Sequence, residues 1–324
     1  MSSDLAILDA VAQAELVRHG DATPRELVEA AISRIENVDP ALNAVVARFF
    51  DRALAEVDAG LPDGPFRGVP FLLKDLGATL GGTIQTEGSR ALRTKVTPSD
   101  SELTRRYRAA GFVILGKTAT PEFGNHSTAE AVLWGPTHNP WDHSRTTGGS
   151  SGGSGAAVAS GMVPAAHGND GAGSIRIPAS CCGLVGLKPT RGRNSWAPAG
   201  DVLSGVAMEH VLTRSVRDSA AILDVTAGWV PGDPSVAPVP ERPFAEEVGR
   251  DPGRLRIAWT ATPPFDGVAV DPACAGAVRD AAGLLATLGH DVEEAAPAFD
   301  GESLIEPFAR VWAIANEEAH RSVV

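Results

Sequence analysis

The chain has 324 residues, of which 43% are hydrophobic and 21% are charged, a balance that is ordinary for a folded globular protein. Its net charge of −12 and the lack of a basic run argue against general nucleic-acid binding, because an acidic surface repels phosphate. Three cysteines exclude a disulfide framework, and with neither an apolar stretch of membrane-spanning length nor a signal peptide, the sequence predicts a cytoplasmic protein that binds no membrane.

The first part of the chain is predicted to be helical. The clearest helix begins with a capping box, in which Thr23 is the N-cap, Pro24 lies in the first turn and Glu26 follows the cap by three residues. A buried strand is expected at 42–47, and another helix at roughly 50–59.

Strands and helices alternate in the rest of the chain. Apolar runs predict buried strands at 68–75, 112–116 and 163–170. Helices are expected from about Asp100, in the alanine-rich run that follows the glycines, and after the cap Ser215. Beyond a proline-rich connector, 255–260, about 272–288 and 290–294 form a β-α-β unit. This alternation predicts an α/β protein.

Residues 148–161, GGSSGGSGAAVASG, are too rich in glycine and serine for an ordinary element. A phosphate-binding loop would end in Lys followed by Ser or Thr, and this stretch has neither. Residues 148–152 match G-x-S-x-G around Ser150, but a glycine-rich stretch produces that match by chance, and no histidine stands in a recognisable triad context. A nucleophile turn and a flexible hinge both stay open.

Two further segments carry candidate chemistry. Residues 168–180, GNDGAGSIRIPAS, place Ser174 after three small residues whose N–H groups can converge on an oxyanion, although a tight turn with an incidental serine explains the segment equally well. Lys74 ends the apolar run GVPFLLKD. It is either a surface lysine with a buried stem or, if fully buried, a neutral amine that can act as a base.

Together these segments resemble the amidase signature family. The two serines are 24 positions apart, as in that family, and GVPFLLKD, GKTATPEFG, GLVGLKPTRGR and TRSVRDSAAILDV are similar to its other motifs. The resemblance covers nearly the whole chain from about residue 5. Two residues depart from the pattern: Asn169 stands where many members have Thr, and Ala172 where many have Gly.

The resemblance implies a Ser-cisSer-Lys triad. Ser174 would be the nucleophile, Ser150 the bridging serine across a cis peptide bond, and Lys74 the neutral base. The expected oxyanion donors are the N–H groups of Gly171, Ala172, Gly173 and Ser174.

Four other residues have expected roles near the triad. Asp170 and Arg176 should brace the turn before the nucleophile. Ser151 either donates to the catalytic hydroxyls or serves as a cap or solvent-facing serine. Asn125 either contacts the substrate amide or caps its loop.

The implied function is that of an amidase, a hydrolase that cleaves the C–N bond of linear or cyclic amides through a serine acyl-enzyme. Its partner is a small-molecule amide, and it needs no cofactor and no metal. Two alternatives stay open: a subunit of glutamyl-tRNA amidotransferase, and a truncated, non-catalytic remnant. The oligomeric state is also open, with a homodimer among the options.

The implied fold is an α/β amidase-signature fold, with a large mixed β-sheet flanked by helices on both faces. Residues 1–324 are expected to be the N-terminal portion of a longer single domain whose C-terminal part is missing. Within it we expect a helical segment at 1–60, the catalytic core at 61–230, the proline-rich connector at 231–253, and the β-α-β unit with the start of the C-terminal part at 254–324.

Overall fold

The computed structural model describes residues 5–298 and 300–321. The chain forms two compact units, one that extends to Val248 and one that covers Gly249–Glu318. The division falls inside the proline-rich segment 231–253. The larger unit holds Lys74 and both serine-bearing segments, so the description of the site concerns that unit alone.

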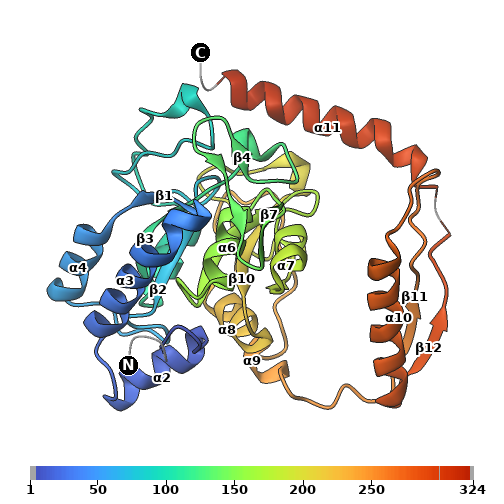
Figure 1. The fold of residues 1–324 in the computed structure, drawn as a ribbon, viewed down its shortest axis with the longest axis horizontal. Helices are drawn as coiled ribbons and strands as arrows, with labels where there is room; N and C mark the ends of the chain where they lie inside the picture. The colour runs from blue at the N-terminus through green and yellow to red at the C-terminus, as the bar shows by residue number, and fades with distance from the viewer. Residues whose placement is uncertain (1–4, 299, 322–324) are drawn as a thin grey trace. The chain divides into compact units, whose positions relative to one another are not determined.

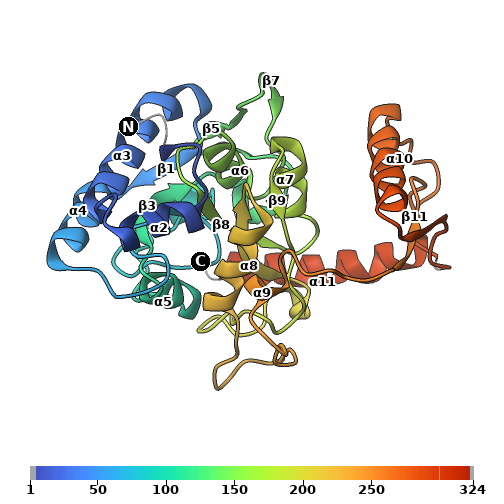
Figure 2. The same cartoon turned by 90° about the horizontal axis from the view of Figure 1, so that it is seen from below.

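The described residues of the larger unit build a six-stranded mixed sheet in the order β1-β3-β2-β8-β10-β9; Figure 1 labels β1, β2, β3 and β10, and Figure 2 labels β8 and β9. Strand β2 runs parallel to its two neighbours, whereas the remaining pairs are antiparallel. The strands are β1 (Val45–Arg48), β2 (Pro70–Lys74), β3 (Val113–Thr118), β8 (Ala165–Asp170), β9 (Val185–Gly186) and β10 (Met208–Thr213).

Helices and two short hairpins surround this sheet (Figure 2). The helices are α2 (Ala10–His19), α3 (Pro24–Leu42), α4 (Phe50–Ala59), α5 (Glu102–Ala109), α6 (Gly152–Ala159), α7 (Arg176–Cys182), α8 (Val216–Thr226) and α9 (Phe244–Glu247). Single 3₁₀ turns are found at η1 (Arg90–Leu92), η2 (Glu122–Gly124) and η3 (Leu203–Gly205). The hairpins pair β4 (Glu130–Ala131) with β5 (Gly135–Pro136), and β6 (His138–Asn139) with β7 (Asp142–Thr146).

Helices cover both faces of the sheet. Alternate residues of a strand point to opposite faces, so neighbouring residues of β2 pack into two different core clusters. Phe71 and Leu73 of β2 belong to a core cluster that includes residues of α2, α5 and α8. Leu72, between them, belongs to a second cluster with residues of α3, α4 and α6. The prediction of a mixed sheet flanked by helices on both faces is therefore confirmed.

Local sequence signals fix several element ends. Thr23 and Glu26 form the predicted capping box of α3, and the Ser215 hydroxyl accepts the N–H of Asp218 at the start of α8. The strand expected at 42–47 starts only at Val45, because α3 continues through Pro40 to Leu42 and ends at Asn43 in a left-handed conformation. Asn43 thus acts as a helix terminator rather than a strand residue.

The smaller unit contains the predicted β-α-β arrangement. Strands β11 (Arg256–Trp259) and β12 (Asp291–Glu294) pair in parallel, and α10 (Pro272–Thr287) connects them (Figure 1). Helix α11 (Glu302–Arg321) follows. In the described part of the chain, no helix combines the length and the apolar character that crossing a bilayer requires.

Candidate active site

Lys74 is the last residue of β2, and its side chain is completely buried. Its Nζ lies 2.6 Å from the Oγ of Ser150 and 2.6 Å from the Oδ1 of Asn169. Loss of hydration lowers the pKa of Lys74 to about 7, although the nearby carboxylates of Asp170 and Glu209 act in the opposite direction. The surface interpretation of Lys74 is wrong, and a neutral amine is accessible near neutral pH.

The glycine-rich stretch is a packed scaffold. Every residue from 148 to 158 is buried, and Ser150 is 2% exposed just before the start of α6. The Gly149–Ser150 peptide bond is cis, as the family resemblance implies. A Cβ at Gly149 would lie 2.3 Å from the carbonyl oxygen of Thr128, so only glycine permits this approach. The hinge interpretation is therefore wrong.

Ser174 lies in the turn between β8 and α7 and is half-buried. The N–H of Ser151 donates to the main-chain oxygen of Ser174 at 3.2 Å, which ties the two serine-bearing segments together. Among the described residues, no hydrogen bond joins the hydroxyls of Ser150 and Ser174. The structure thus brings Lys74 and Ser150 into direct contact and holds Ser174 beside them through the main chain.

Asp170 braces this turn as expected. Its fully buried carboxylate accepts the Nε and Nη2 of Arg176 at 2.8 and 2.9 Å, and the main-chain N–H of Ile175 at 3.2 Å. It also accepts the N–H of Gly173 at 2.6 Å. That last bond corrects the expected oxyanion donors, because the Gly173 N–H already has a charged acceptor.

The other expected oxyanion donors are unaffected by this bond. Within the described residues, the N–H groups of Gly171, Ala172 and Ser174 donate to no protein acceptor. The backbone of Ala172 lies outside the left-handed region, so its methyl group imposes no strain there.

Ser151 and Asn125 occupy different surroundings. The hydroxyl of Ser151 donates to the main-chain oxygen of Asn169 at 3.3 Å, so its bond partner is a carbonyl and not a catalytic hydroxyl. Asn125 is exposed, and its N–H donates to the oxygen of Glu122 at the end of η2. The preceding Gly124 borders the site, since a Cβ on it would lie 3.3 Å from Ser150 Oγ.

Three buried polar residues behind Lys74 were not predicted from the sequence as site residues. Asn169 contacts the amine directly. The Nδ1 of His167 accepts the main-chain N–H of Lys74 at 3.2 Å, so the proton of a neutral His167 lies on Nε2. That Nε2 is 3.2 Å from Oε1 of Glu209, which faces Asn169 across the β8–β10 pair.

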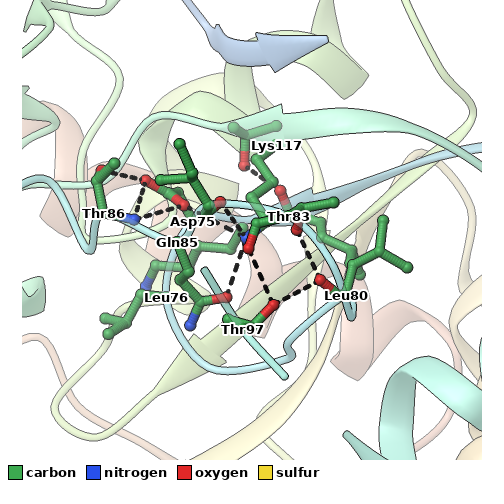
Figure 3. Close-up of polar contacts among 12 residues, drawn as sticks. Asp75, Leu76, Leu80, Thr83, Gln85, Thr86, Thr97 and Lys117 are labelled. Atoms are coloured by element: carbon green, nitrogen blue, oxygen red, sulfur yellow. Dashed lines mark hydrogen bonds and ion pairs between the residues drawn. The ribbon is translucent and has the colours of Figure 1, made fainter. Parts of the chain in front are cut away.

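Lys117 is a second fully buried lysine beside the site (Figure 3). Its Nζ donates to the oxygen of Ile84 at 2.8 Å and to Oε1 of Gln85 at 3.2 Å, and it lies 3.7 Å from Oδ1 of Asp75. Asp75 also accepts the hydroxyl of Thr86. Burial lowers the pKa of Lys117 to about 8 and raises that of Asp75. These contacts hold the loop after β2, and none of them involves a serine.

Comparison with known proteins gives a consistent result. The protein-family model described as Amidase matches residues 26–319. A 6-aminohexanoate-cyclic-dimer hydrolase of Paenarthrobacter ureafaciens is 49% identical over 313 residues, which are 95% of this chain and 63% of that protein. The chain therefore spans less than two thirds of that relative's length.

Among the solved structures that resemble this fold are two amide hydrolases. A 6-aminohexanoate cyclic dimer hydrolase complexed with substrate superposes with a TM-score of 0.90 at 47% identity, covering 95% of this chain and 64% of that one. A bacterial aryl acylamidase of the amidase signature family gives a TM-score of 0.89 at 31% identity, covering 98% and 67% of the two chains.

Proposed function

The chain belongs to the amidase family, and on that premise we propose that it hydrolyses amides through a serine acyl-enzyme. The observation that carries the proposal is the contact between Lys74 and Ser150, in which an amine with a pKa near 7 lies 2.6 Å from a buried hydroxyl. A buried amine that is neutral at physiological pH is a usable general base.

In the proposed acylation step, the Oγ of Ser174 attacks the amide carbonyl. The proton of Ser174 passes to Ser150 as the proton of Ser150 passes to Lys74. The tetrahedral intermediate then collapses, the C–N bond breaks, and the nitrogen takes the proton back through the same two groups and leaves as an amine. Water attacks the resulting ester by the same path and releases the acid.

The negative charge of the intermediate needs donors at the turn before Ser174. We assign this role to the N–H groups of Gly171, Ala172 and Ser174, because the N–H of Gly173 is bonded to Asp170. Donors fixed by the fold need no reorganisation as charge develops, which is why such sites contribute strongly to catalysis. The loop at Asn125, which adjoins Ser150 through Gly124, is the proposed contact for the substrate amide.

The proposed substrate is a small linear or cyclic amide. Support comes from the relative that is 49% identical and is named for hydrolysis of the cyclic dimer of 6-aminohexanoate. We place the reaction in the cytoplasm, where the free thiols of Cys181, Cys182 and Cys274 would stay reduced.

Turnover of defined amides tests the proposal. The purified protein should open the cyclic dimer of 6-aminohexanoate, or cleave a linear acyl amide, with products followed by liquid chromatography and mass spectrometry. Ser174→Ala serves as the inactive reference. A folded protein that cleaves none of these amides, or that releases ammonia from glutamine alone, would contradict the proposal.

A further inference from the structure

We propose that Asn169 is a positioning residue, whose amide oxygen holds the Lys74 amine with its lone pair directed at Ser150. This inference rests on the proposed function, because it concerns the base of that reaction. Lys74 Nζ has two polar contacts among the described residues, Ser150 Oγ and Asn169 Oδ1, each at 2.6 Å. The contact with Asn169 therefore decides how the amine is oriented toward Ser150.

The orientation of the Asn169 amide follows from its other bond. Its Nδ2 donates to the main-chain oxygen of Leu76 at 2.9 Å. Rotating the amide by 180° would place two oxygens against each other, so the amide oxygen must face Lys74. Asn169 is also 7% exposed and lies within β8, so its side chain has little freedom to move.

The chemistry of the contact then fixes the amine. A neutral amine has two N–H bonds and one lone pair, and an amide oxygen accepts but never donates. One N–H of Lys74 must therefore point at Asn169, which limits rotation about the Cε–Nζ bond and leaves the lone pair available to the Ser150 hydroxyl. A hydroxyl in place of the amide could donate as well as accept, and would not impose this direction.

Several charged or titratable groups surround the same amine, and none of them replaces Asn169. Asp170 and Glu209 influence Lys74 through their charge. His167 accepts the main-chain N–H of Lys74 and does not contact the Lys74 amine. On the neighbouring strand β3, Lys117 is paired with Asp75. Asn169 alone among these groups gives the amine a neutral acceptor.

Two substitutions distinguish the role of the Asn169 oxygen, which contacts Lys74, from the role of the Asn169 NH₂ group, which donates to Leu76. Asn169→Leu and Asn169→Asp both remove the bond to Leu76, but only Asp keeps an oxygen for Lys74. The matched control is Asn194→Leu, because Asn194 is also buried, and its amide donates to the main-chain oxygen of Glu209 at 2.7 Å without touching Lys74. Wild type and Lys74→Ala are measured in parallel, with kcat and KM recorded as functions of pH.

We expect Asn169→Leu to lower kcat about 100-fold at every pH with KM unchanged, the cost of a misplaced reacting group. Asn169→Asp should recover most of that loss at high pH and shift the acid limb of the profile upward, because a carboxylate added to those of Asp170 and Glu209 further favours the protonated amine. Asn194→Leu should lower the melting temperature without either effect.

Equal losses of kcat in Asn169→Asp and Asn169→Leu without a shifted limb would show that only the bond to Leu76 matters, and would overturn the inference. A near-normal kcat for Asn169→Leu would overturn it as well, while an active wild type and an inactive Lys74→Ala leave the proposed function intact. A folded wild type that turns over no amide would overturn both.

Discussion

The Nζ of Lys74 and the Oγ of Ser150 lie 2.6 Å apart, and both side chains are almost completely removed from water. The strand end that carries the lysine and the glycine-rich segment that carries the serine are 76 positions apart in the chain. Their contact couples a base to a hydroxyl in a medium where a charged ammonium is disfavoured, and the predictions below depend on that coupling.

The activity should fall as the pH is lowered, with an apparent pKa near 7. Burial lowers the pKa of Lys74 to about that value, and below it the amine is protonated and cannot accept the proton from Ser150. Measurement of kcat/KM for amide hydrolysis between pH 5 and 10 reports this pKa for the free enzyme. An acid limb near the ordinary lysine value of about 10.4 would contradict the role of burial.

Lys74→Ala should lower kcat by several orders of magnitude, because the proton path acts as a unit. Lys117→Met is the matched control, since Lys117 is equally buried but its partners among the described residues are Ile84, Gln85 and Asp75, none of which is a serine. It should destabilise the fold, measured by thermal denaturation, while leaving the pH profile of the remaining activity in place. A Lys74→Ala variant within tenfold of wild type would exclude Lys74 as the base.

Glu209→Gln should move the acid limb to lower pH. The carboxylate of Glu209 favours the protonated form of Lys74 and so raises its pKa, and replacing it with a neutral amide of similar shape removes that effect. Asp218→Asn is the control, because Asp218 is a buried carboxylate that bonds the N–H groups of Ala10 and Val11 away from the site. An acid limb of the pH profile that does not move in Glu209→Gln, or that moves equally in Glu209→Gln and Asp218→Asn, would contradict this prediction.

Asp170→Ala should cost about 2 kcal/mol of unfolding free energy and abolish most activity, because it leaves the buried N–H of Gly173 without its acceptor. Chemical denaturation measures the first effect. Asp142→Ala breaks an ion pair with Arg145 in which both side chains are exposed, and should change stability by less than about 1 kcal/mol. Equal effects of the two variants would show that the Asp170 turn is not a structural brace.

Local sequence signals predicted the elements of the site well. The apolar run ending at Lys74 is strand β2, and the small residues before Ser174 form its turn. The capping box at Thr23 was predicted because its hydrogen bonds join residues three positions apart. In each case the interactions that decide the structure join residues that are close in sequence, or they depend on the pattern of apolar residues alone.

The residues that surround the Lys74 amine could not be predicted in the same way. Glu209 faces Asn169 only because β10 pairs with β8 in one register, and nothing local to either strand specifies that register. The bond from Gly173 to Asp170 depends on how the turn folds back on its own carboxylate. Long-range pairing and side-chain packing, which a linear pattern does not contain, determine both.

The identity of the nucleophile is the central claim, and covalent labelling tests it most directly. A fluorophosphonate probe forms a stable adduct with an activated serine, and peptide mass spectrometry locates that adduct. We predict labelling at Ser174 that requires Lys74 and disappears in Ser174→Ala. Labelling at Ser150 that persists in Ser174→Ala would contradict the assignment of Ser174 as nucleophile and Ser150 as the bridging serine.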